Sequence, residues 1–549
     1  MIHLKGKVLF KASTTLAATG FLLFGYDQGV MSGIITNDHW IALMGNPSAA
    51  IVGSVVALYE IGCMFGALSC GKIGDKIGRR RTIRIGSVIL IVGAVLQTAM
   101  IDLTMAIISR IITGIGNGMI TATVPVYQSE VAPPTSRGSD IAYECTLLVI
   151  GMSMAYWLEF GLYYVGGEFA WRFPLAFQII FAVILLLGTF ILPETPRWLI
   201  SKDRYEDAKV VLARLWTNED TAHPRCIAEF EEIRDGIELE RRMGESSYKE
   251  LFSKGKFNNR YRVCLGMLSQ IIQQLSGINA TTYYLTTVFK QAGFSTPMAM
   301  MFGGVDTIVY FIGSLFPVFF VERVGRRAIM LWGLVGQAVT LVCLAGCQKA
   351  GLDYKSGAIS TPGGDAGAAA FTMLYNFTFG ASWLGMAWLY PAEIFSTSMR
   401  AKGNSMSTAA NWLGNFIVAE ITPVLFESIS FWTYILFAFL NVAFIPMVYF
   451  WFPETKGLTL EQIEVLFATA EVKADALSIQ EHHHHHPASV GSHGNFDLEK
   501  VEFDSSHVEK VEQDNGSSSG DGGHASDSGN EGEKNTSHQT QQNNNKVDQ

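Results

Sequence analysis

Five ionisable residues of this 549-residue chain fall inside long apolar stretches: Asp27, Glu60, Arg110, Glu144 and Asp306. Charged side chains are expensive at membrane depth, so such residues are candidates for ion or proton pathways. Burial disfavours the ionised form of a carboxylic acid, whereas a neighbouring arginine favours that form. An acid placed beside an arginine in such a stretch can therefore take up and release a proton.

A second group of residues is polar but uncharged. Gln273 and Gln274 precede Gly277, and Asn279 and Tyr283 follow it, four residues apart on one helical face. Neutral hydrogen-bonding groups of this kind suit the hydroxyls of a sugar, whereas a charged ligand calls for Arg or Lys. A helix break at Gly277 would let both groups reach one cavity. The alternative is hydrogen bonding between helices, but so many polar groups in one span favour a binding site.

The elements that carry these residues are predicted membrane spans. The chain is 49% apolar and only 16% charged, and a run of about 20 apolar residues crosses about 30 Å of hydrocarbon as a helix. Windows of about 19 residues give twelve spans, at residues 12–33, 49–70, 82–101, 103–125, 140–162, 173–192, 262–288, 298–320, 328–346, 367–391, 403–424 and 430–452. The sequence therefore predicts an all-α membrane protein with twelve transmembrane helices.

The connections between the spans indicate an orientation. Lysines and arginines follow the even-numbered spans, at Lys72, Lys76, Arg79, Arg80, Arg81, Arg137, Arg323, Arg326, Arg327, Arg400 and Lys402. Cytoplasmic loops carry the excess of cations in membrane proteins. We therefore expect a multi-pass protein with these exits and both termini in the cytoplasm. The expected location is the plasma membrane.

Composition divides the chain into five parts. They are an N-terminal six-helix half (residues 1–192), a cytoplasmic linker (193–261), a C-terminal six-helix half (262–456), an amphipathic post-membrane segment (457–480) and an acidic tail (481–549). The tail holds 13 acidic and four basic residues and so carries the whole net charge of −9. Because it is polar and lacks Tyr, Trp, Ile and Met, we expect it to be disordered in the cytoplasm.

Three sequence features occur once in each half. The motif acid-x-x-Gly-Arg-Arg follows the second and eighth spans. A Glu and an Arg seven residues apart follow the fourth and tenth spans, and Pro-Glu-Thr follows the sixth and twelfth. Their charged residues are Asp75, Arg79, Arg80, Glu130 and Arg137 in the first half, and Glu322, Arg326, Arg327, Glu393 and Arg400 in the second. Topology alone explains the cations but not the matched acids, so the pattern indicates a duplicated six-helix unit.

These residues resemble a known family over roughly residues 12 to 470. The matching motifs are Phe24-Gly-Tyr-Asp27, the Gly71 to Arg80 loop, Ser109-Arg110, Pro125-Val-Tyr-Gln-Ser-Glu130, Pro193-Glu-Thr-Pro-Arg197, Gln273-Gln274, Gly277-Ile-Asn279, Tyr283-Tyr284, Pro391-Ala-Glu393 and Pro453-Glu-Thr-Lys-Gly457. Together they are similar to the sugar porters of the major facilitator superfamily. Tyr127-Gln-Ser-Glu130 and Glu144 are most similar to the fungal branch that includes glycerol-proton symporters and pentose and hexose carriers.

The resemblance implies roles for individual residues. Asp27 and Arg110 match the positions that proton-coupled members pair, with a static ion pair as the alternative. Trp388 and Asn411 match solute contacts and join Gln273, Gln274, Asn279 and Tyr283 in the expected site. The ten duplicated charges match an intracellular gate that would favour the outward-open state when it is formed, with topology setting as the alternative.

Two positions depart from the usual sugar pattern. Cys145 stands where hexose and xylose carriers usually have Gln, and Asp306 stands where Asn is common. The missing Gln removes a sugar contact, which weakens the case for a hexose. Asp306 could be a second protonatable group, or a neutral acid held by a hydrogen bond.

The resemblance implies a secondary active transporter that imports a pentose, a hexose or glycerol by alternating access with proton symport. The alternatives are a facilitative carrier without proton coupling and a non-transporting sugar sensor. The expected partners are a small neutral polyhydroxylated solute, the proton and the lipid bilayer. We expect no enzyme activity, cofactor, metal site or nucleic acid partner, since the chain shows no set of nucleophile, base and orienter, no metal set and no basic surface. The missing P-loop argues against an ATP-driven pump. The His482 to His486 run is interpreted as low complexity, with a metal-binding run or a tag remnant as alternatives.

Overall fold

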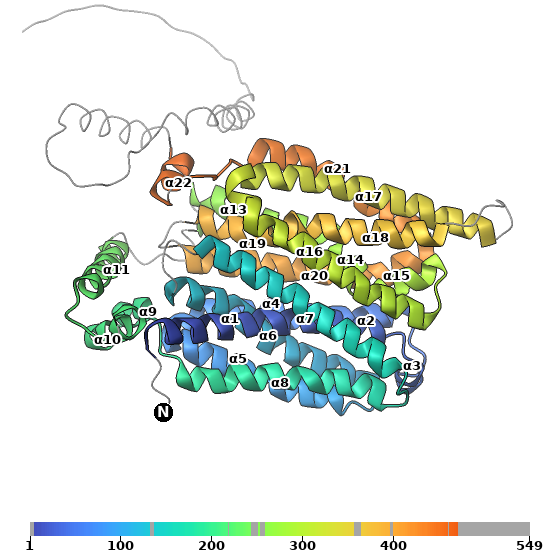
Figure 1. The fold of residues 1–549 in the computed structure, drawn as a ribbon, viewed down its shortest axis with the longest axis horizontal. Coiled ribbons are helices and arrows are strands. Elements are labelled where there is room, and N and C mark those ends of the chain that lie inside the picture. The colour runs from blue at the N-terminus through green and yellow to red at the C-terminus, as the bar shows by residue number, and fades with distance from the viewer. Residues whose placement is uncertain are drawn as a thin grey trace, which may run out of the picture. The chain divides into compact units, whose positions relative to one another are not determined.

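Helices form all the regular secondary structure in the part of the chain that the computed structural model describes (Figure 1). This part comprises residues 5–131, 137–217, 219–242, 251–252, 258–355, 364–395, 399–458 and 460–469. Contacts divide the chain into Met1–Asp504 and Ser505–Gln549, and every described residue lies in the first unit. The expectations for the acidic tail and its histidine run fall outside the described residues.

The N-terminal half is built from long apolar helices. Its elements are α1 (Gly6–Gly29), α2 (Met31–Ile34), α3 (Asp38–Leu43), α4 (Ala49–Ile77), α5 (Arg79–Thr98), α6 (Leu103–Val131), α7 (Arg137–Tyr163) and α8 (Phe169–Ile191). Within this half α4 and α5 both pack against α6, α1 packs against α7, and α5 packs against α8.

The C-terminal half repeats this packing. Its elements are α13 (Asn259–Leu275), α14 (Ile278–Thr282), α15 (Leu285–Ala292), α16 (Thr296–Val324), α17 (Arg326–Lys355), α18 (Gly364–Gly380), α19 (Trp383–Ile394), α20 (Arg400–Ile429) and α21 (Trp432–Trp451). Here α16 and α17 both pack against α18, α13 packs against α20, and α17 packs against α21. The helix pairs correspond one to one with those of the first half, which agrees with the predicted duplication.

Short amphipathic helices lie between and after the halves. They are α9 (Pro196–Ser201), α10 (Tyr205–Trp216), α11 (Pro224–Arg242) and α22 (Leu460–Phe467). Helix α10 lies in the linker between the halves, and its Ala208, Val211, Leu212 and Leu215 are buried.

Ten of the described helices are long and apolar enough to cross a membrane. The other two predicted spans, 262–288 and 367–391, are each built from shorter helices. The first breaks at Gly277, as the sequence predicted, where φ is +102°. The second breaks between Gly380 and Trp383, a break that the sequence analysis did not predict.

The segment from Gly71 to Arg80 differs from the sequence prediction. The sequence suggested a loop, but α4 continues to Ile77 and α5 begins at Arg79. Gly78, the residue between them, has a φ of +97°, which favours glycine. A Cβ on Gly78 would also collide with the carboxylate of Glu194.

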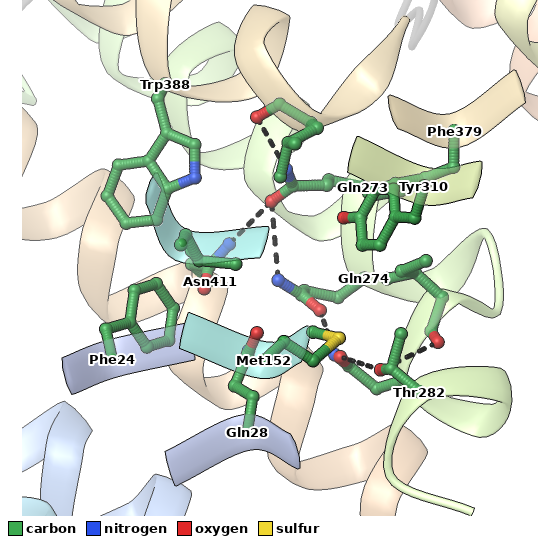
Figure 2. A pocket seen from close by; sticks show the side chains of 14 residues that line it. Phe24, Gln28, Met152, Gln273, Gln274, Thr282, Tyr310, Phe379, Trp388 and Asn411 are labelled. Atoms are coloured by element: carbon green, nitrogen blue, oxygen red, sulfur yellow. Dashed lines mark hydrogen bonds between the residues drawn. The ribbon is translucent and has the colours of Figure 1, made fainter. Parts of the chain in front are cut away.

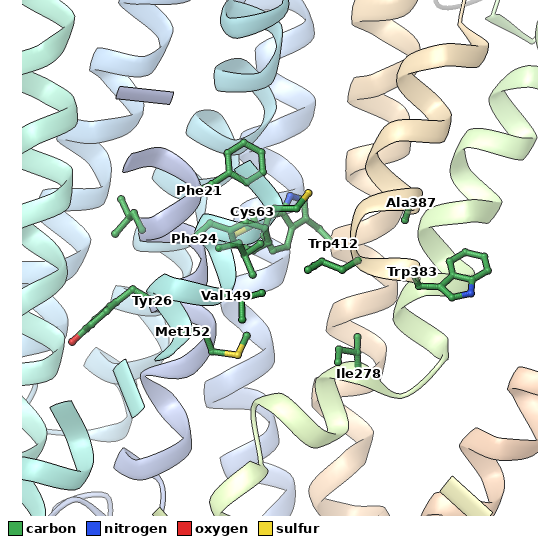
Figure 3. Close-up of a cluster of buried hydrophobic side chains, with 14 of the residues drawn as sticks. Phe21, Phe24, Tyr26, Cys63, Val149, Met152, Ile278, Trp383, Ala387 and Trp412 are labelled. Carbon is green, nitrogen blue, oxygen red and sulfur yellow. The ribbon is translucent and has the colours of Figure 1, made fainter. Parts of the chain in front are cut away.

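The two halves meet along two pairs of helices, α4 with α20 and α7 with α16. Buried hydrophobic side chains, among them Phe24, Met152 and Trp412, lie near the middle of the spans where the halves meet (Figure 3). Phe24 on α1 lies 5.1 Å from Trp412 on α20 in an edge-to-face arrangement, measured between ring centroids. This interface positions the cavity described next.

Candidate solute site and proton-coupling residues

A cavity lies between the two halves, beside the break in each discontinuous span (Figure 2). It is lined by Phe24, Gln28, Leu148 and Met152 of the N-terminal half and by Gln273, Gln274, Ile278, Asn279, Thr282, Tyr310, Phe379, Leu384, Trp388 and Asn411 of the C-terminal half. Its free volume is about 30 Å³, enough for roughly two or three water molecules. A sugar therefore enters only if the lining side chains move apart.

Gln273 is the centre of a hydrogen-bond network on one wall of the cavity (Figure 2). Its amide nitrogen donates to the backbone carbonyls of Trp383 and Leu384 at 3.1 and 3.3 Å, at the start of α19. Its amide oxygen accepts from Asn411 at 2.8 Å and from Gln274 at 3.3 Å. One side chain thus links α13 with the broken tenth span and with α20.

Gln270 belongs to the same network, although the sequence analysis did not single it out. Pro391 lacks an N–H group, so the carbonyl of Ala387 in α19 has no donor within its helix. The amide of Gln270 donates to this carbonyl at 2.8 Å, and its oxygen accepts from Asn411 at 2.6 Å. The spacing of three residues before Gln273 was the available signal, because it places both amides on one helix face.

Asn279 lies at the cavity, whereas Tyr283 does not. Asn279, on α14, donates a hydrogen bond to the side-chain oxygen of Gln274. Tyr283, the residue after α14, is fully buried and directs its hydroxyl to Glu60 on α4. The glycine break therefore brings Asn279 to the glutamines, while Tyr283 links the two halves.

Aromatic rings border the polar wall of the cavity. Trp388 on α19 lies 6.4 and 6.5 Å from Phe21 and Phe24 on α1, measured between ring centroids. Together with the amides, these rings offer hydrogen bonds for hydroxyl groups and an apolar face for a sugar ring. Gln28, next to Asp27 in sequence, adds a polar group from the N-terminal half that the sequence analysis missed.

Asp27 and Arg110 both contact Tyr59, but these two described residues form no direct ion pair with each other. The hydroxyl of Tyr59 on α4 donates to Asp27 Oδ2 at 2.9 Å. The guanidinium of Arg110 lies over the Tyr59 ring, 4.3 Å from its centroid, and donates to the backbone carbonyls of Val55 and Val56. Tyr59 therefore connects the acid and the base that were expected to contact each other directly.

Asp306 lies in the C-terminal half, away from Arg110. Its Oδ2 accepts a hydrogen bond of 2.5 Å from the Asn376 amide, and the amide oxygen of Asn376 accepts from Thr281 on α14 at 3.1 Å. No cation contacts Asp306 among the described side chains. Asp306 is therefore held by a hydrogen bond from the second discontinuous span, and both sequence interpretations of this acid remain predictions.

The duplicated charges form a network around Arg79 in the N-terminal half. Its guanidinium lies 3.0 Å from Glu130 and 3.1 Å from Asp75. Glu194 accepts hydrogen bonds from the backbone N–H groups of Arg79 and Arg80 at 3.0 and 3.2 Å and so caps α5. Burial raises the pKa of Glu194, and these backbone N–H groups oppose that shift.

The C-terminal half repeats this network residue by residue. Arg326 lies 2.6 Å from Glu393 and 2.7 Å from Glu322. Glu454 accepts from the backbone N–H groups of Arg326 and Arg327 at 2.8 and 3.0 Å and so caps α17. The duplication predicted from sequence thus extends to individual hydrogen bonds.

These ion pairs stay within one half each. They hold the start of α5 to α4 and α6 in the first half, and the start of α17 to α16 and α19 in the second. The resemblance implied an intracellular gate formed by these charges. The pairs of Arg79 and Arg326 connect helices within one half, and the gate remains a prediction. The side chains of Arg137 and Arg400 lie outside the described residues.

The sequence profile of the family described as "Sugar (and other) transporter" matches residues 13–467. The chain is a member of this sugar transporter family. The transporter is 36% identical to the sugar transporter STL1 of Saccharomyces cerevisiae over 544 residues, which covers 94% of this chain and 93% of the relative. It is 30% identical to the high-affinity glucose transporter of Kluyveromyces lactis over 464 residues, 82% of this chain and 84% of the relative.

Solved structures support the same fold. The proton:xylose symporter XylE bound to 6-bromo-6-deoxy-D-glucose matches with a TM-score of 0.70 and 25% identity, over 84% of this chain and 99% of that chain. A partially occluded inward-open form of XylE from E. coli matches with a TM-score of 0.68 and 23% identity, over 82% of this chain and 99% of that chain. These matches confirm the predicted family and the twelve-helix fold of a multi-pass membrane transporter.

Proposed function

We propose that this transporter imports a neutral polyhydroxylated solute, a pentose, a hexose or glycerol, together with a proton. The observation that carries the proposal is the cavity between the halves, whose polar groups come from neutral side chains: Gln28, Gln273, Gln274, Asn279, Thr282, Tyr310 and Asn411. Among the described residues, no Lys, Arg, Asp or Glu lines it. Such a lining suits hydroxyl groups and disfavours an ionic solute, because a buried charge needs a partner.

Proton coupling is assigned to Asp27 with Arg110. Asp27 is 1% exposed and lies next in sequence to Gln28, which lines the cavity. A buried carboxyl near a single guanidinium can change its protonation state when the distance between them changes. Tyr59, which contacts both groups, is placed to transmit such a change between α1, α4 and α6.

The charge networks are proposed to act at the cytoplasmic face of the plasma membrane, where the positive-inside rule also puts both termini. Each network makes one half rigid by tying its helix ends together. Alternating access in related folds is largely rigid-body rocking of two bundles around a central site. Rigid halves with a solute cavity between them suit that motion.

Uptake of a labelled sugar and polyol panel in transporter-null fungal cells tests this proposal. We expect one or more neutral polyols or sugars to accumulate above the external concentration, and an uncoupler to abolish that accumulation. Uptake that only equilibrates would indicate a facilitative carrier. Binding without movement of any solute would indicate a sensor, and preferential uptake of an ionic solute would contradict the assignment of the cavity.

A further inference from the structure

Glu60 on α4 is a buried acid to which the proposed cycle gives no role. The residue is 0% exposed. Its Oε1 accepts a hydrogen bond from the hydroxyl of Tyr283, and its Oε2 has no hydrogen-bond partner in the described part of the chain. Tyr283 belongs to the other half and follows α14, the short helix that carries Asn279. The contact thus joins Glu60 of the N-terminal half to the segment of the C-terminal half that carries Asn279.

Several titratable groups face Glu60 from the helices around it. They are Asp27 of α1, Arg110 of α6, Tyr283 and Tyr284 between α14 and α15, and Tyr59 and Cys63 of α4 itself. Helix α20 contributes the neutral Asn415, whose amide donates to the Tyr283 hydroxyl at 3.2 Å. Glu420 of α20 accepts a hydrogen bond from Ser54, which lies before Glu60 on α4.

This set contains two carboxyls and a single cation. Arg110 acts electrostatically on both Asp27 and Glu60. With both acids ionised, the buried cluster would carry a net negative charge, which is unfavourable away from water. Arg110 can balance the charge of one of the two acids, so ionisation of one disfavours ionisation of the other. Tyr59 contacts Asp27, and Glu60, its neighbour on α4, contacts Tyr283, so the two acids are linked through α4.

We infer that Glu60 is a second coupling residue, a positioning carboxyl whose protonation state sets how firmly α14 is tied to α4. A hydrogen bond from Tyr283 to an ionised carboxylate is stronger than one to a neutral acid. When a proton binds Glu60 on its free Oε2, Tyr283 keeps its own proton and the tie weakens. Release of α14 then lets Asn279 move as the halves move. The inference rests on the proposed proton symport.

A double-mutant cycle read as a pH profile tests this role. Tyr283→Phe removes the donor that favours ionised Glu60, so the midpoint of the pH profile of solute counterflow should move to more alkaline pH. A shift of about one to two pH units is expected for the loss of one hydrogen bond to a charged group. In a Glu60→Gln chain, the same Tyr283→Phe change should leave the profile where it is.

Two further variants keep the test decisive. Glu159→Gln changes another buried acid, which bonds the backbone of Gly33 on α2, and in that chain Tyr283→Phe should still move the midpoint. If Tyr283→Phe does not reach the membrane, Glu60→Asp, whose shorter side chain withdraws from Tyr283, should move the midpoint in the same direction.

A constant change in apparent KM at every pH, or an equal shift in the Glu60→Gln chain, would assign Tyr283 a structural role and overturn the inference. Counterflow needs no proton gradient, so this result is separable from failure of the proposed function. If the wild type accumulates solute but Tyr283→Phe leaves the midpoint of the counterflow pH profile unchanged, only this inference is overturned. A wild type with neither accumulation nor any pH dependence overturns both.

Discussion

The Asp27→Asn variant is expected to lose accumulation of solute against a gradient while it retains solute exchange. Asn has the size of Asp and can still accept the hydrogen bond from Tyr59, which is 2.9 Å in the native chain. It cannot ionise, so it imitates the permanently protonated transporter. The fully loaded protein can still change conformation and return with solute, but it cannot return empty after releasing a proton. Concentrative uptake and counterflow, measured in the same vesicles, separate the two activities.

Asp306→Asn is the matched control for this variant. Asp306 is also 1% exposed and also accepts a single hydrogen bond, from Asn376, but it lies away from Arg110. We expect this control to accumulate solute like the wild type. Full, uncoupler-sensitive accumulation by Asp27→Asn would contradict the assignment of proton coupling to Asp27. Loss of accumulation in Asp306→Asn alone would instead assign proton coupling to Asp306 in the C-terminal half.

The second large effect is expected at the polar wall of the cavity. Asn279→Ala should raise the apparent KM by roughly 5- to 150-fold, the equivalent of about 1 to 3 kcal/mol for a buried polar group left without its partner. Gln273→Ala should raise it at least as much. It should also lower the amount of folded transporter, because Trp383, Leu384 and Asn411 lose a hydrogen bond.

Gln178→Ala provides a comparison for the loss of a buried amide. Gln178 is fully buried and bonds Gln97 and the Leu175 carbonyl within the N-terminal half, away from the cavity. Its removal should reduce abundance without changing KM. Uptake kinetics normalised to surface protein measure both quantities. Normal KM values in Asn279→Ala and Gln273→Ala would mean that these amides only connect helices and that the solute binds elsewhere.

The fold was predictable where it depends on local patterns. Apolar runs define ten continuous spans, and Gly277 marks the break in another because glycine adopts positive φ without strain. The break before Trp383 lacks such a marker, because Gly380 ends α18 without a positive φ and Ala381 and Ser382 do not force a helix to end. Amides of α13 donate to the carbonyls of Trp383, Leu384 and Ala387 in α19, just after the break, and that compensation comes from tertiary packing.

The candidate site divides in the same way. Gln273, Gln274 and Asn279 were predictable as polar residues in an apolar stretch, because burying amides there is expensive without a reason. Gln270 was missed because its partner, the Ala387 carbonyl, lies more than 100 residues away in sequence. That carbonyl is free because Pro391 has no N–H group. Tyr59 and Tyr283 were harder, because hydroxyls that join two helices have no signature in sequence.

Proton movement driven by solute tests the central proposal most directly. Purified transporter is placed in vesicles that contain a pH-sensitive dye, without a pH gradient, and the solute identified by the uptake panel is added outside. A symporter carries protons inward with the entering solute, so the interior should acidify, and Asp27→Asn vesicles should show no acidification. Solute entry by the wild type without any change in interior pH would contradict the account and identify a facilitative carrier.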